Sequence, residues 1–244
     1  MNLLLYTLLK VSASDEPLPP TGERMKYFYA DIASAEDGRH YVEINIGGPS
    51  EKATKMSLSV STLSPQLYVM DAECKQCLNM HSYDHDFSKT SELKEIFASQ
   101  QNIFKYEGQS QLIKKYWVDV NRYYDLVKFH FKETSKQMHK SIGLNVFSIL
   151  SSTPDYKSRY DDGVLGLAPN DPTNYYIQNN LMSQLIKFEA IDNNIFSIFL
   201  NSEPGESTHI KFGGWDQVGL QDDENLTLIR TVDRNSWGLL FNNL

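Results

Sequence analysis

Four side chains with soft or borderline donor atoms lie close together in the sequence. Cys74 and Cys77 are the only cysteines, and His81 and His85 follow them at short, even intervals. Thiolates and imidazoles bind tetrahedral zinc, but zinc fingers usually place about a dozen residues between the two ligand pairs so that both face one metal. A disulfide and a pair of free thiols are the other interpretations. A redox role is disfavoured, because no βαβ context surrounds the Cys-x-x-Cys.

Nucleophilic catalysis by serine finds little support in the sequence. Serines are plentiful, but none of them lies in a Gly-x-Ser-x-Gly elbow. The remaining histidines have no partner at catalytic spacing, so we expect them to be strand or loop residues; they are His40, His130, His139 and His209.

The composition is that of an ordinary globular protein. The chain has 244 residues, of which 41% are hydrophobic and 22% charged, enough for a sizeable core. Its 23 basic and 31 acidic residues leave a net charge of −8. An acidic surface repels phosphate backbones and anionic lipids, so we expect no nucleic-acid partner and no charge-driven membrane binding. The 14 tyrosines and 12 phenylalanines favour strands.

The N-terminal region carries processing signals. Apolar residues run from Leu3 to Leu9, and Val11 and Ala13 suit the −3 and −1 positions of a signal-peptidase site. We therefore expect residues 1–14 to be a secretory signal peptide, with a frayed N-terminal arm as the alternative. Residues 15–37 begin with a proline-rich, charged stretch and are expected to be a linker or a pro-segment remnant. No other stretch approaches the ~18 apolar residues that span a bilayer.

Short strands separated by turn signals dominate the rest of the chain. Apolar and polar residues alternate over 41–46, the period of a half-buried strand, and Gly47-Gly48-Pro49 ends the run. Apolar residues recur at helical spacing within 180–191 and predict a helix there. The pattern predicts an all-β domain with one or two short helices. The other expected strands are 56–69 with a break around 63–65, 111–120, 126–131, 142–150, 195–200 and 209–212.

Four segments, in this order, resemble the pepsin-like aspartic proteases. Residues 41–49 (YVEINIGGP) resemble their opening strand, and 161–168 (DDGVLGLA) match their Asp-Gly-Ile-Leu-Gly-Leu-Ala segment nearly residue for residue. Residues 180–200 are similar to the helix and following strand of the same lobe, and 206–216 to the Leu-x-x-Gly-Gly-x-Asp after it. The resemblance covers roughly residues 38–241 and implies a pepsin-like lobe of packed, mostly antiparallel sheets.

The resemblance places a serine at the first catalytic position. These enzymes use two aspartates that share one proton, and the first stands in Phe-Asp-Thr-Gly-Ser-x-x-Leu-Trp-Val. Residues 60–69 here read VSTLSPQLYV, so Ser61 replaces the aspartate and Leu63 replaces the glycine. A serine hydroxyl does not titrate in the useful range and cannot act as the base. We therefore expect no catalytic residue, only a degenerate position formed by Ser61, Thr62 and Leu63.

The length of the chain fits one lobe of the two in this family. Residues 38–230 are expected to form the N-terminal lobe, and residues 231–244 the first strand of a C-terminal lobe that is otherwise missing, because 235–241 (NSWGLLF) resembles its opening motif. We predict a non-catalytic homologue that needs no cofactor and binds an extended peptide or a protein partner over its exposed face. The alternative is a truncated form of an active aspartic endopeptidase.

The resemblance assigns roles to several other residues. Tyr106 lies where the flap tyrosine of the family folds over the substrate, with an ordinary surface aromatic as the alternative. Asp162, Gly163 and Gly166 fall in a motif whose aspartate is structural in the family.

Two further features bear on the cellular compartment. The family closes a small disulfide loop where Cys74 and Cys77 lie, so the resemblance implies a disulfide and no metal. Asn225 begins the single N-glycosylation sequon. Together with the signal peptide, these features predict a secreted protein or one in a lysosome-like lumen.

Overall fold

The structure is a computed structural model of the chain. It describes residues 7–10, 26–35, 38–48, 53–78, 80–96, 101–107, 112–131, 141–153, 156–157, 161–169, 180–201, 208–215, 231 and 237, without the side chains of 7–10, 101–107 and 112–114. The elements are β1 (Thr7–Lys10), β2 (Phe28–Ser34), β3 (His40–Ile46), β4 (Thr54–Ser61), β5 (Leu67–Met70), β6 (Glu92–Ile96), β7 (Gln101–Glu107), β8 (Leu112–Phe129), β9 (Ile142–Thr153), β10 (Gly163–Gly166), α1 (Leu181–Lys187), β11 (Ile195–Phe199) and β12 (His209–Phe212).

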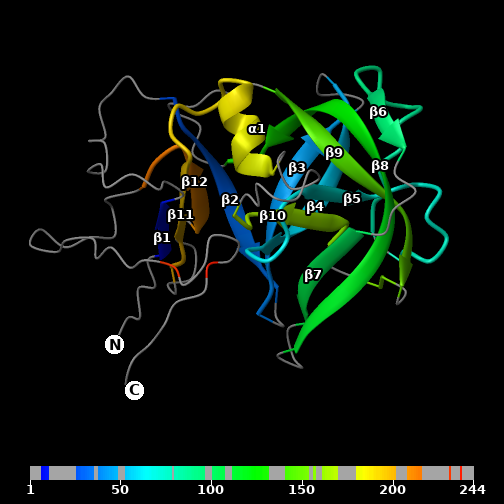
Figure 1. Cartoon of the computed structure of the whole chain (residues 1–244), viewed down its shortest axis with the longest axis horizontal. Coiled ribbons are helices and arrows are strands. Elements are labelled where there is room, and N and C mark those ends of the chain that lie inside the picture. Colours follow the sequence, from blue (N-terminus) through cyan, green and yellow to red (C-terminus); the bar gives the residue numbers. More distant parts are fainter. Residues whose placement is uncertain are drawn as a thin grey trace, which may run out of the picture.

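The strands form one continuous, curved sheet (Figure 1). Its order is β1-β11-β12-β2-β3-β4-β10-β5-β9-β8-β6, with β7 also paired to β8. Because β8 pairs back with β3, the six strands from β3 to β8 in that order close on themselves. Only β4–β10 and β5–β9 are parallel among the described pairs. The expected all-β, mostly antiparallel fold is therefore confirmed.

Two apolar cores lie against the sheet, and successive residues of the central strand β5 belong to one core and the other in turn. In β5, Leu67 and Val69 belong to the larger core, whereas Tyr68 and Met70 belong to the smaller one. Successive side chains of a strand point to opposite faces, which produces this division. All four residues of β5 and of β10 are buried, as expected of strands that are covered on both faces.

One helix is present among the described residues, and it lies where helical spacing predicts it. Asn180 caps its N-terminus by accepting the Ser183 N–H at 2.8 Å. Glu189, in the left-handed region at φ 54°, follows its last turn. This helix, α1, is shorter than the 180–191 range, and no helix in the described part of the chain is long and apolar enough to cross a membrane.

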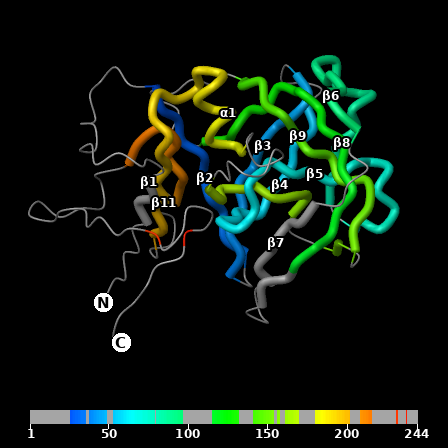
Figure 2. The backbone as a smooth tube through the Cα atoms, in the orientation of Figure 1, coloured from blue at the N-terminus to red at the C-terminus, as the bar shows by residue number. Residues whose placement is uncertain are grey.

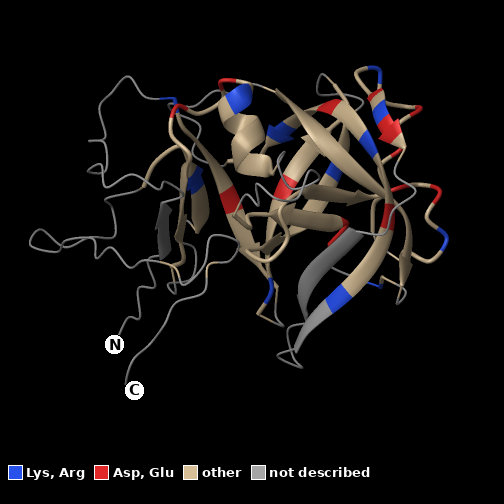
Figure 3. Cartoon of the chain, in the orientation of Figure 1, with Lys and Arg blue, Asp and Glu red and all other residues tan. Residues whose placement is uncertain are grey.

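Strand β8 is longer than the sequence predicts. The expected strands at 111–120 and 126–131 are one element, because residues 121–124 continue the ladder with β6 on one side and β9 on the other. Acidic and basic residues are concentrated in β6 and the neighbouring turns at the edge of the molecule (Figure 3).

Part of the segment 15–37, which is expected to be a linker or a pro-segment remnant, belongs to the sheet, because residues 28–34 form β2. β2 pairs with β3 and with β12. Phe28, Ala30 and Ile32 are buried in the larger core and alternate with less buried residues. The prolines upstream predict a linker, but this apolar alternation and its burial decide the structure of residues 28–34.

Residues 7–10, which fall in the expected signal peptide, form β1 and pair with β11. Cleavage of a signal peptide stays a prediction.

Candidate functional site

The loop that joins β4 to β5 carries the degenerate catalytic position. β10 lies between these two strands, parallel to β4 and antiparallel to β5. Figure 2 shows the paths of β4 and β5 through the centre of the sheet. The Gly166 N–H donates to the Gln66 carbonyl at 2.9 Å, and the Ala168 N–H donates to the Ser64 carbonyl at 3.0 Å. The sheet therefore fixes the loop at the end of β10.

Ser61 is the last residue of β4, and its side chain shapes this loop. Its Oγ accepts the N–H of Leu63 at 3.3 Å and the N–H of Ser64 at 3.2 Å. Serine and aspartate side chains both form turns of this kind, in which an oxygen accepts from residues two and three positions later. The turn needs an oxygen acceptor, and serine supplies one without a carboxylate.

The chemistry open to this position follows from that substitution. Ser61 is 9% exposed, and its neutral hydroxyl cannot share a proton with a carboxylate as an aspartate pair does. Thr62 and Leu63 are exposed, with Leu63 at 43%. The loop therefore presents an apolar side chain beside a non-ionising residue, an arrangement suited to contact rather than to proton transfer.

Two side chains from later in the sequence support the segment after β10. The Asn180 Nδ2 donates to the Ala168 carbonyl at 3.2 Å, and the Trp237 indole N–H donates to the Leu167 carbonyl at 2.9 Å. The Leu167 N–H in turn donates to the Ser61 carbonyl at 2.7 Å. Trp237 and Ser61 therefore bond to the same residue, Leu167. No pattern in the sequence predicts this proximity.

Asp162 links β4 to the segment that follows the cysteines. Its buried carboxylate accepts the Ser57 N–H at 2.9 Å and the His81 N–H at 2.6 Å, and it contacts the His81 Nδ1 at 3.0 Å. Three contacts to one buried group join two distant segments. These contacts agree with a structural role, which stays a prediction.

The neighbouring Asp161 is held in a second buried network. Its carboxylate accepts from the Ser59 hydroxyl at 2.9 Å, from Arg39 at 3.3 Å and from the Tyr156 hydroxyl. Burial raises the pKa of Tyr156 well above its ordinary value, so the phenol stays protonated and donates. The sequence did not predict this network, because Arg39 and Ser59 are far from Asp161 in the chain.

Asp162→Asn is expected to destabilise the fold by about 2 kcal/mol, because an amide nitrogen cannot accept the N–H groups that a carboxylate oxygen accepts. Chemical denaturation monitored by circular dichroism measures this. Asp86→Asn is the control, because that side chain is 87% exposed and its change should stay within about 0.5 kcal/mol. Equal midpoints for the two variants would contradict the role assigned to Asp162.

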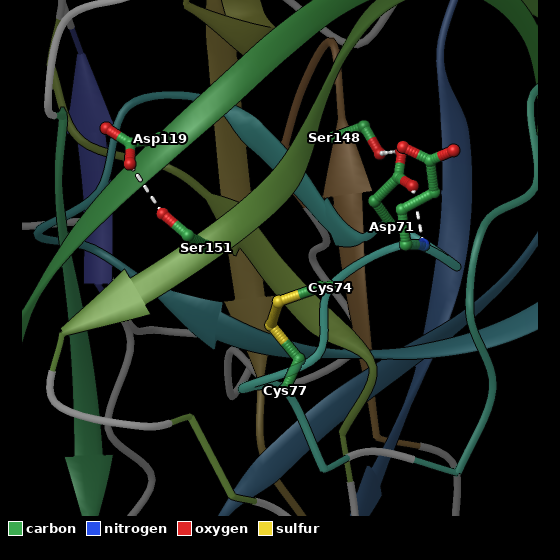
Figure 4. The surroundings of a disulfide bond; sticks show 7 residues. Asp71, Cys74, Cys77, Asp119, Ser148 and Ser151 are labelled. Carbon is green, nitrogen blue, oxygen red and sulfur yellow. Dashed lines mark hydrogen bonds between the residues drawn. A yellow bond between two sulfur atoms is a disulfide. The ribbon is translucent and has the colours of Figure 1, made fainter.

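Cys74 and Cys77 form a disulfide, as the resemblance implies (Figure 4). Both are buried in the smaller core. Because the two sulfurs are bonded to each other, neither is a free thiol or a zinc ligand in this structure. His81 contacts Asp162, and His85 stacks on Tyr123 with ring centroids 4.7 Å apart. Within the described part of the chain, no three His, Cys, Asp or Glu residues are grouped as metal ligands.

Replacing both cysteines by alanine is expected to lower the free energy of unfolding by about 2 kcal/mol, the entropic value for so short a loop. Urea denaturation of the variant and of the wild type measures this. Wild type treated with a reductant is the matched control and should lose a similar amount. A loss below about 0.5 kcal/mol in both would contradict a stabilising disulfide.

Several predicted site residues lie wholly or partly outside the described residues. Tyr106 is placed in β7 opposite Ile113 of β8, so it lies on a strand pair as a flap residue would, but its side chain is not described. Asn225 is outside the described residues. Of residues 231–244, only Thr231 and Trp237 are described, so the strand expected there stays a prediction.

The protein is therefore a β-rich protein in which β10 lies between β4 and β5, at the loop that follows Ser61. The family model named eukaryotic aspartyl protease matches residues 39–242, which is most of the chain. The chain belongs to the eukaryotic aspartyl protease family. A search of curated proteins found no match.

Proposed function

We propose that this chain is a non-catalytic member of the family that binds extended peptides or protein segments. One observation carries the proposal: at the loop where the family has its first catalytic aspartate, Ser61 keeps the turn through its Oγ but supplies no carboxylate. Losing a general base typically costs about 10²–10⁴ in rate. The alternative, a truncated active endopeptidase, would need a carboxylate from elsewhere at this same position.

Binding is the activity that the fold retains when the carboxylate is absent. Strand edges offer rows of backbone N–H and C=O groups, and an extended peptide pairs with such an edge as an added strand. The paired strands β7 and β8, of which β7 lies beside β4, and the exposed Leu63 provide further surface. We propose a secretory or lysosome-like compartment for this activity, because a disulfide persists under oxidising conditions.

The test titrates a pool of labelled extended peptides with the full chain at acidic and neutral pH and follows fluorescence polarisation. The bound peptides are then recovered, and their masses are measured by mass spectrometry. Saturable binding with unchanged peptide masses is the expected result, and Ser61→Ala should bind equally well. Absence of binding would overturn the binding role, and shortened peptides that disappear in Ser61→Ala would overturn the non-catalytic role.

A further inference from the structure

The outermost strand at one end of the sheet comes from the N-terminal segment of the chain. β1 pairs antiparallel with β11, with Thr7 opposite Ile198 and Lys10 opposite Ile195. No other pairing of β1 is present among the described strands, and Figure 1 shows it at the edge beside β11. The four residues of β1 therefore cover the edge of β11, and β11 is the one described strand with which they pair.

The backbone of β11 shows which of its residues bind that outer strand. The N–H of Gly213, the residue that directly follows β12, donates to the Ile195 carbonyl at 2.7 Å, so this carbonyl faces the β12 side of β11. Along an antiparallel strand, the backbone polar groups of successive residues alternate between the two neighbours. Phe196 and Ile198 therefore direct their N–H and C=O groups towards β1.

The register identifies the partners of these two residues. Leu9 lies opposite Phe196, and Thr7 lies opposite Ile198. The backbone groups of Leu8, between them, point away from β11. Without an outer strand, Phe196 and Ile198 would present unpaired backbone groups on a strand whose Phe196 side chain is 1% exposed.

The occupant of this edge is a short strand at the end of a long connection. Residues 11–27 separate β1 from β2 and contain three prolines, so ordering β1 requires closing this connection for four residues with one described neighbour. The signal-peptidase site expected after Ala13 lies just beyond β1, so cleavage there would remove the strand and leave the edge open.

We propose that the outer edge of β11 is the site at which an extended peptide binds, antiparallel to Ile195–Ile198, and that Thr7–Lys10 is its intramolecular competitor. This inference rests on the proposed peptide-binding function and names the edge that performs it. Loss of the N-terminal strand is the event that opens the site.

The test compares two proline variants of the full chain, with the mass of each verified. Leu9→Pro removes an N–H that faces β11, whereas Leu8→Pro removes one that points away, so the two differ only in the pairing. The probe is a fluorescent peptide with the sequence of residues 6–11, YTLLKV. Leu9→Pro should bind it about tenfold more tightly than Leu8→Pro or the wild type, because the intramolecular competitor is lost.

Two N-methylated forms of the YTLLKV probe test the same hydrogen-bonding pattern, with the change made in the peptide instead of in the protein. N-methylation at the residue matching Leu9 should abolish binding, and N-methylation at the residue matching Leu8 should not. A preparation whose mass shows cleavage after Ala13 should bind the unmodified probe as tightly as Leu9→Pro does.

Equal affinities for the two methylated probes, or for the two proline variants, would overturn the inference. Failure of YTLLKV to bind Leu9→Pro while the peptide pool still binds would also overturn it and leave the proposed function intact. Failure of every peptide to bind would instead overturn the proposed function.

Discussion

Gly166→Ala is expected to prevent the chain from folding or to lower its free energy of unfolding by at least about 4 kcal/mol. A Cβ at this position would lie 2.4 Å from the carbonyl oxygens of both Ser64 and Gln66, which are backbone atoms of the loop that follows Ser61. Real Cβ atoms do not approach so closely, so β10 or the loop has to move. Soluble yield and thermal unfolding by calorimetry measure the effect.

Gly214→Ala is the matched control for that experiment. The nearest atom to its new Cβ is the flexible Lys211 Cε at 3.6 Å, so the same substitution should change stability by less than about 1 kcal/mol. Similar unfolding temperatures for the two variants would show that β10 does not pack between β4 and β5 as described.

Asp125→Ala is expected to lower the free energy of unfolding by about 4 kcal/mol. The Asp125 carboxylate is fully buried in β8 and accepts from Tyr83 at 2.7 Å, Ser88 at 2.7 Å and Thr90. Burial raises the pKa of Tyr83, which therefore stays a donor. Alanine would remove the carboxylate acceptor from the buried Tyr83 hydroxyl and from the half-buried Ser88 and Thr90 hydroxyls, and would release the 83–90 segment from β8.

Asp119→Ala provides the comparison, because this half-buried residue of the same strand accepts from Ser151 alone among the bonds described. Its expected loss is below about 1 kcal/mol. Urea denaturation and amide hydrogen exchange of residues 83–90 follow both variants. Unchanged exchange in Asp125→Ala would contradict the anchoring role.

Local patterns in the sequence predict most of the strands but not how far they extend. The alternation at 41–46 and the helical spacing after Asn180 are sufficient to predict β3 and α1, because burial of one face produces a periodic pattern within a few residues. The residues of β8 between 121 and 124 carry mixed polar and aromatic side chains, and their pairing with two neighbours decides their structure. Non-local pairing of this kind leaves no local signal.

The candidate site shows the same division. The resemblance placed Ser61 by register with its neighbours, and the structure puts it at the end of β4, where the loop to β5 begins. The half-buried partners Arg39 and Trp237 could not be predicted, because each meets the site region from a distant part of the chain. The sequence shows where a polar residue lies but not which residue it bonds to in the fold.

We expect the Ser61 position to support no aspartic-type catalysis. The experiment that tests this incubates the full chain with a denatured protein under acidic conditions, with and without a pepstatin-type inhibitor, and follows the fragments by mass spectrometry. The expected result is that no inhibitor-sensitive fragments form at any incubation time. Fragments that form at a rate proportional to the concentration of the chain and vanish with the inhibitor would contradict it.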